Sequence, residues 1–113
     1  MVPPEDLMGA REFYLDELGF TEVPMPSTFT NVIGFWAESG SIQIHIGVES
    51  GVDRSKTAAH NALVVDNLDQ WRIKLASLGC ETMVAIPIPG RRRLSFRDPF
   101  GNCLELFEYD ALV

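Results

Sequence analysis

The segment Glu17–Glu22 reads Glu-Leu-Gly-Phe-Thr-Glu, and sixty positions later Ser77–Thr82 reads Ser-Leu-Gly-Cys-Glu-Thr. In each copy a helical pattern closes on Leu-Gly, and a short strand-like pattern follows. At the same offset His45 corresponds to Glu105, and each lies in a short run of alternating apolar residues. A repeat of this length predicts that the chain contains two copies of one supersecondary unit.

The composition is that of one ordinary globular domain. A chain of 113 residues can bury a core without disulfides. The net charge of −7 argues against a nucleic-acid partner, because phosphate binding needs clustered basic residues, and the one basic cluster is Arg91–Arg93. No apolar run has the length of a membrane span, and the N-terminus lacks a signal-peptide pattern. We therefore expect a cytoplasmic protein in which Cys80 and Cys103 are reduced thiols.

The hydrophobic periodicity predicts an α+β fold with two helices, at 5–18 and 67–78, each ended by a glycine. Asp66 or Asn67 is the expected N-cap of the second helix. Alternating patterns predict strands at 20–23, 31–37, 41–48, 60–65, 81–86, 92–97 and 102–107. The second copy is therefore β-α-β-β-β, whereas the first is α-β-β-β and lacks the strand that should precede its helix. We expect a single domain, with module one at about 1–50 and module two at about 59–113.

Three residues with metal-binding side chains fall on these strands: His45, His60 and Glu105. Imidazole and carboxylate ligands suit zinc, nickel, manganese or iron(II). Two histidines and one carboxylate would leave coordination positions open for a substrate. The spacing alone does not decide the matter, because the residues come from different strands. His45 as a hydrogen-bonded strand histidine and Glu105 as a solvent-facing residue are the alternatives.

Three segments resemble the vicinal oxygen chelate superfamily, which comprises glyoxalases, bleomycin-resistance proteins and extradiol dioxygenases. They are 11–20, 59–66 and, most distinctively, 98–106, which reads Asp-Pro-Phe-Gly-Asn-Cys-Leu-Glu-Leu. The resemblance runs from about Pro3 to Phe107 and keeps the family's order and spacing. It implies two βαβββ modules that form a cupped mixed sheet, with the first strand of the first module missing from this chain. It also implies a homodimer.

The resemblance further implies which residues form the site. In metal-dependent members the ligands come from the first and last strands of each module, which here gives His45, His60 and Glu105. Glu105 and His45 would also be the catalytic residues. The fourth ligand position falls just ahead of Met1. A start that omits an upstream strand, a natural variant with three ligands or none, and a strand supplied by a partner chain are the three explanations.

Other side chains are candidates for contact with a substrate. An arginine at Arg91 or Arg93 could hold a carboxylate or phosphate group, although such runs are more often solvated turns. Alternation places these two arginines on one face of their strand. Trp36 could line the cup and bind an apolar substrate, with plain core packing as the alternative.

These observations predict a metal-dependent enzyme that acts on a small substrate through two neighbouring oxygens. Isomerase or lyase, thiol-transferase and dioxygenase chemistries all stay open, and the histidine at position 45 weakens the isomerase prediction, since glyoxalases resembling this chain usually carry a glutamate there. The alternative is a metal-free protein that sequesters a drug, for which the charge of −7 would favour a cationic ligand. A degenerate relative retained for a structural or regulatory partner is the third possibility.

Overall fold

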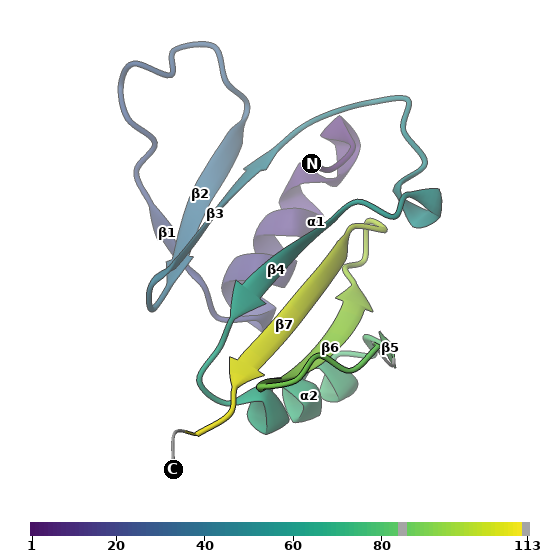
Figure 1. Ribbon diagram of the computed structural model, residues 1–113. Helices are drawn as coiled ribbons and strands as arrows, with labels where there is room; N and C mark the ends of the chain where they lie inside the picture. The colour runs from purple at the N-terminus through teal and green to yellow at the C-terminus, as the bar shows by residue number, and fades with distance from the viewer. Residues whose placement is uncertain (84–85, 112–113) are drawn as a thin grey trace. The chain divides into compact units, whose positions relative to one another are not determined.

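The computed structural model describes residues 1–83 and 86–111, in two compact units, Met1–Val52 and Asp53–Val113 (Figure 1). Each unit combines helix with its own sheet, which confirms the predicted α+β class. That the two units form one domain stays a prediction. Part of the predicted strand at 81–86 lies outside the described residues. Within the described residues, no helix is long and apolar enough to cross a membrane.

The helix of the first unit has three parts where a single helix was predicted. A 3-10 turn, η1 (Pro4–Asp6), leads into α1 (Leu7–Arg11), which widens into a π-helical segment, η2 (Glu12–Glu17). At its end the Leu18 amide donates to the Phe13 carbonyl, five residues back, at 2.8 Å. Gly19, with φ of 84°, then ends the helix as the sequence predicts.

The sheet of the first unit is antiparallel, with the order β1-β2-β3. Its strands are β1 (Thr21–Val23), β2 (Gly34–Ser39) and β3 (Ile42–Gly47). β2 begins at Gly34, three residues later than predicted. A Cβ atom at Gly34 would lie 2.0 Å from the Ile46 carbonyl oxygen, so the backbones approach here as only glycine permits.

Val2 occupies the place where a first strand would end. It forms a parallel bridge with Val48, and its amide donates to the Gly47 carbonyl at 2.9 Å. In the second unit the Val65 amide donates to the Phe107 carbonyl at the same distance, and Phe107 is sixty positions after Gly47. The hydrogen bonds therefore make Val2 the structural counterpart of Val65, which is sixty-three positions later, three more than the offset of the repeat.

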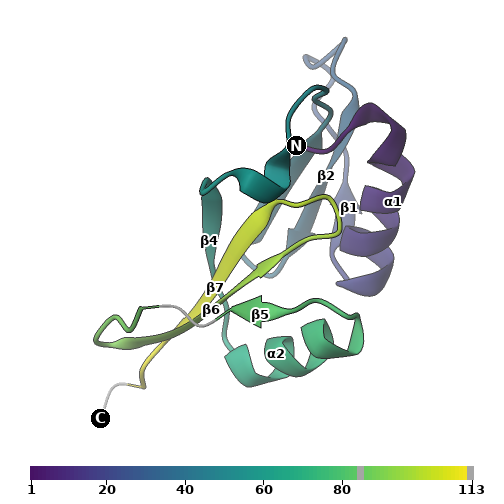
Figure 2. The same cartoon turned by 90° about the vertical axis from the view of Figure 1, so that its right-hand side faces the viewer.

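The second unit has the predicted β-α-β-β-β order. Its elements are η3 (Arg54–Lys56), β4 (His60–Val64), α2 (Leu68–Ser77), β5 (Thr82–Met83), β6 (Arg91–Arg97) and β7 (Cys103–Tyr109). The sheet order is β4-β7-β6-β5, with β4 parallel to β7 and the other pairs antiparallel. α2 packs on β5, β6 and β7, on one face of the sheet (Figures 1 and 2).

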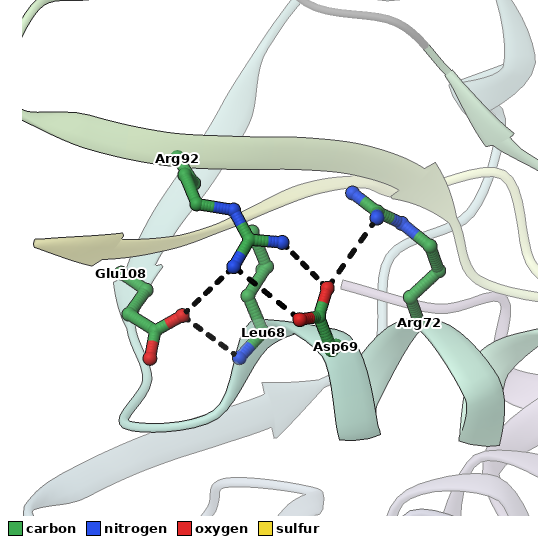
Figure 3. Close-up of polar contacts among 5 residues, drawn as sticks. All are labelled: Leu68, Asp69, Arg72, Arg92 and Glu108. Atoms are coloured by element: carbon green, nitrogen blue, oxygen red, sulfur yellow. Dashed lines mark hydrogen bonds and ion pairs between the residues drawn. The ribbon is translucent and has the colours of Figure 1, made fainter. Parts of the chain in front are cut away.

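The start of α2 is held by the sheet rather than by the predicted cap. Asn67 is the N-cap residue, but its side chain makes no capping hydrogen bond. Instead the Leu68 amide donates to Glu108 Oε2 at 3.4 Å, and Arg92 bridges Glu108 and Asp69 (Figure 3). The hydrogen bond from Arg92 lowers the pKa of Asp69 and raises that of Arg92 itself. This network ties the first turn of α2 to β6 and β7.

Candidate metal centre

The face of the second sheet that carries the candidate ligands is the face away from α2. Arg92 and Glu108 reach α2, and side chains alternate along a strand, so Arg93 and Glu105 lie on the opposite face. β4 supplies His60, whose neighbour across the parallel pair is Cys103. Arg91 and Arg93 both lie in the continuous strand β6, and side chains two positions apart in a strand point to the same face. The structure thus confirms that these two arginines share one face of β6.

His60 and Glu105 come together on this face. The His60 Nδ1 lies 3.1 Å from the Ala58 carbonyl oxygen, which can only accept a hydrogen bond. In the neutral ring the proton is therefore on Nδ1, and the lone pair is on Nε2. That Nε2 atom lies 3.5 Å from Glu105 Oε2. The His60 side chain is 47% exposed and the Glu105 side chain 8% exposed, so the histidine is accessible to solvent while the carboxylate it faces is buried.

This arrangement fits two ligands of a divalent cation. A neutral imidazole nitrogen and a carboxylate oxygen that face each other are both acceptors, and a cation between them satisfies both. A histidine whose other nitrogen donates to a backbone carbonyl is also the usual arrangement of a metal-bound histidine. In residues 1–83 and 86–111, however, no three His, Cys, Asp or Glu side chains form a group that could hold a metal ion.

Arg93 holds the Glu105 carboxylate from the neighbouring strand. Its Nε, which is fully buried, lies 2.7 Å from Oε1 without the alignment of a hydrogen bond, and its Nη2 donates to Oε2 at 3.3 Å. Its Nη1 donates to the Ile86 carbonyl at 2.7 Å. This ion pair is not predicted from the sequence. The register of β6 and β7, which makes the two residues diagonal neighbours on one face, is the signal that reveals it.

The other arginines of β6 on this face have different neighbours. The Arg91 guanidinium lies over the rings of Phe107 and Tyr109, at 4.8 and 5.5 Å from their centroids. Arg97 donates to three backbone carbonyls, those of Arg54, Thr57 and Gly101. Arg97 therefore fixes the segment that leads into β4, whereas Arg91 keeps its charge beside an aromatic surface. A role of Arg91 or Arg93 in substrate binding stays a prediction.

His45 and Trp36 lie in the first unit, directly opposite each other on β3 and β2. Their rings are stacked, with centroids 3.7 Å apart and planes within 2° of parallel. Phe29 meets the Trp36 ring edge-on at 5.3 Å. Phe35 is buried and Trp36 lies on the other face, so the core role belongs to Phe35. The metal-binding and catalytic roles of His45 and the substrate-binding role of Trp36 stay predictions.

The turn that precedes β7 is built by Asp98. One carboxylate oxygen accepts hydrogen bonds from the amides of Phe100 and Asn102, and the other accepts from the Asn102 side chain. Asp98 is buried, and these hydrogen bonds from its carboxylate shape the turn. The turn sets where β7 begins and thereby positions Glu105 on the sheet.

Comparisons with known proteins agree with this architecture. A protein from Bacillus anthracis that is assigned to the glyoxalase family is 33% identical, with a TM-score of 0.81, 96% of this chain and 88% of that chain covered. An antibiotic-binding protein from Streptomyces is 20% identical, with a TM-score of 0.69 and coverage of 96% and 91%. A variant of the fosfomycin resistance protein FosX from Listeria monocytogenes, crystallised with Mn(II) and a dihydroxypropylphosphonic acid, is 19% identical, with a TM-score of 0.71 and coverage of 93% and 85%.

The last two likenesses show the fold alone, because their identities are low. No curated protein matches the sequence. The family model described as Glyoxalase/Bleomycin resistance protein/Dioxygenase superfamily matches residues 1–106, almost the whole chain. Together with the β-α-β-β-β repeat, this match shows that the chain belongs to the glyoxalase/bleomycin resistance/dioxygenase superfamily.

Proposed function

We propose that this protein is a metal-dependent enzyme that acts on a small oxygenated substrate, with His60 and Glu105 as two of its metal ligands. His45, the residue equivalent to Glu105 in the repeat, is the proposed third ligand. The observation that carries the proposal is the His60 geometry. Nδ1 donates to the Ala58 carbonyl, and Nε2 faces the Glu105 carboxylate. The repeat, the donor types and the FosX relative with Mn(II) support the same conclusion.

A bound divalent ion would supply Lewis-acid polarisation of two neighbouring substrate oxygens. The chain's own residues prepare the site for it. The Ala58 carbonyl accepts from Nδ1 and so holds the His60 ring with its Nε2 toward the Glu105 carboxylate. Arg91, whose guanidinium is held over two aromatic rings, is the proposed contact for an anionic substrate group. Isomerase or lyase, thiol-transferase and dioxygenase reactions all use this kind of site, and Glu105 and His45 are the proposed catalytic residues.

Elemental analysis of metal-loaded protein tests the proposal. Protein stripped with chelator is reloaded separately with zinc, nickel, manganese and iron(II), desalted and measured by plasma mass spectrometry. We expect about one ion per chain, lost in His60→Gln and in Glu105→Gln. Gln70→Leu, at an exposed position of α2, is the matched control and should keep the ion. Absence of stoichiometric metal after every loading would overturn the proposal.

A metal-free binding function is the second candidate, and one contact favours it. The Arg93 guanidinium already neutralises the buried Glu105 carboxylate, so the pair is electrostatically satisfied without a metal. The antibiotic-binding relative and the net charge of −7, which attracts cationic ligands, point the same way. Calorimetric titration of a cationic glycopeptide drug in the presence of chelator distinguishes the two, since binding there would require no metal. The homodimer and the cytoplasmic location stay predictions.

A further inference from the structure

One face of the first sheet carries a row of polar and aromatic side chains that end on His45. The register pairs Trp36 with His45 and Glu38 with Gln43, so all four side chains lie on the face opposite the buried Phe35. Gln43 lies between Glu38 and His45. Its amide nitrogen donates to Glu38 Oε1 at 2.7 Å, and its amide oxygen lies 2.8 Å from His45 Nε2.

The direction of these hydrogen bonds follows from the chemistry of the three groups. An ionised carboxylate can only accept, so Glu38 must face the NH₂ end of the Gln43 amide. The oxygen end of that amide is then the end that faces His45. An amide oxygen also only accepts, so His45 Nε2 must carry a proton. The contact with Glu38 therefore determines which end of the Gln43 amide is the nitrogen and which is the oxygen. The amide orientation in turn determines which imidazole nitrogen of His45 carries the proton.

We propose that Gln43 and Glu38 are positioning residues that hold neutral His45 as the Nε2–H tautomer and so present Nδ1 as its free ligand nitrogen. The inference rests on the proposed function for its metal, but the tautomer itself does not. Trp36 contributes by stacking on the ring, because a face-to-face contact at 3.7 Å opposes the rotation about the Cβ–Cγ bond that would exchange the positions of the two ring nitrogens. The two histidines then offer different atoms, Nδ1 from His45 and Nε2 from His60, whose Nδ1–H is held by Ala58.

Nitrogen NMR of metal-free protein tests the tautomer directly. The chain has two histidines, so protein labelled with ¹⁵N-histidine gives four ring resonances, which His60→Gln assigns. At about pH 9, where an ordinary imidazole is neutral, we expect a protonated Nε2 and an unprotonated Nδ1 in His45, and the opposite in His60. A protonated Nδ1 in His45, or two equal intermediate shifts, would overturn the proposal.

Variants at position 43 separate positioning from folding. In Gln43→Leu both His45 resonances should move toward those of a free imidazole, while the His60 resonances stay unchanged. In Gln43→Glu the new carboxylate still accepts from Nε2, so the tautomer should be retained. Unchanged His45 shifts in Gln43→Leu would overturn the proposal.

Zinc titration of the same samples connects the tautomer with metal binding. Zn²⁺ should shift Nδ1 of His45 and Nε2 of His60, and Gln43→Leu should weaken zinc affinity about tenfold while Gln70→Leu leaves it unchanged. Zinc shifts at Nε2 of both histidines would overturn the proposed ligand atom but leave the proposed function standing. No shift at either histidine would overturn the proposed function, and the metal-free spectra would still decide the tautomer.

Discussion

Arg93 and Glu105 form an ion pair across adjacent strands, with Nε 2.7 Å from Oε1 and with only 19% and 8% of their side chains exposed. The carboxylate therefore has two competing uses. It neutralises a buried guanidinium, and on its other oxygen it faces His60. Any cation that binds between His60 and Glu105 has to share the carboxylate with Arg93.

Replacing Arg93 tests this competition. In Arg93→Leu the metal-free protein should lose about 3 kcal/mol of unfolding free energy, because the buried Glu105 carboxylate loses its guanidinium partner. The double variant Arg93→Leu with Glu105→Leu should recover most of that loss. Urea unfolding in chelator measures both. Arg91→Leu is the control, since the contacts described for the Arg91 guanidinium are with two aromatic rings, and it should cost about 1 kcal/mol. Equal losses at positions 91 and 93 would contradict the argument.

The same variant has a second expected property. Because the competing guanidinium is gone, Arg93→Leu should bind zinc or manganese more tightly than the parent chain, and metal should raise its melting temperature more. Calorimetry and thermal unfolding with and without the ion measure the change. A weaker affinity would show that Arg93 orients the carboxylate for the ion rather than competing with it.

The Asp69–Arg92 pair should make the docking of α2 sensitive to acid. Arg92 lowers the pKa of Asp69 below its ordinary value of 3.8, so the pair stabilises the folded state above that pH. The contribution disappears as the pH falls through the lowered folded-state pKa, where Asp69 becomes protonated. Unfolding free energies of the parent and Asp69→Asn, measured between about pH 7 and pH 2, should therefore converge in acid. A constant difference across this range would refute the argument.

Replacing Gly34 by alanine should lower the stability of the folded protein. The added Cβ would lie 2.0 Å from the Ile46 carbonyl oxygen, so β2 and β3 would have to separate. We expect Gly34→Ala to cost about 3 kcal/mol of unfolding free energy. Gly40→Ala is the matched control, because Gly40 has φ of 59° with no atom within 4 Å of the new Cβ, and should cost about 1 kcal/mol. Comparable losses at the two glycines would show that the strands adjust.

Asp98 should be needed for the turn before β7. Asp98→Ala leaves the amides of Phe100 and Asn102 without their buried acceptor and should cost about 3 kcal/mol. Asp66→Ala, at an exposed position, is the control and should change stability by less than about 0.5 kcal/mol. Urea unfolding decides the comparison, and similar values for the two variants would contradict the assigned role.

The sequence predicted the fold well because its signals are local and repeated. Leu-Gly helix ends, period-two strands and the turn at Asp98 each follow from a few neighbouring residues, and the sixty-residue offset carries them from one copy to the other. Two details were not predicted from the sequence. The first helix ends in a π-helical segment, and the amide of Leu68 is capped by Glu108, forty residues later.

For the candidate site, the sequence indicates which residues carry metal-binding side chains, but it does not show which residues these side chains contact. That Glu105 faces away from its leucine neighbours follows from alternation, and its burial confirms that it is not a solvent-facing residue. Its ion pair with Arg93 depends on the register of β6 and β7, which no single-strand pattern contains. The hydrogen bond from Gln43 to Glu38 likewise requires the register of β2 and β3.

The strand order of the second unit determines when the candidate centre can form during folding. Among the strands that the structure describes, β4 pairs with β7 alone, which is the last of them, and this parallel pairing encloses α2, β5 and β6. Bringing β4 and β7 together closes a long loop, and the chain entropy lost in this step opposes folding until the contacts between the two strands have formed. His60 and Glu105 are therefore expected to meet in the last step of folding, after the local β2–β3 and β6–β7 hairpins have formed, and a ribosome-bound chain that still lacks β7 would not yet offer the Glu105 carboxylate to an ion at His60.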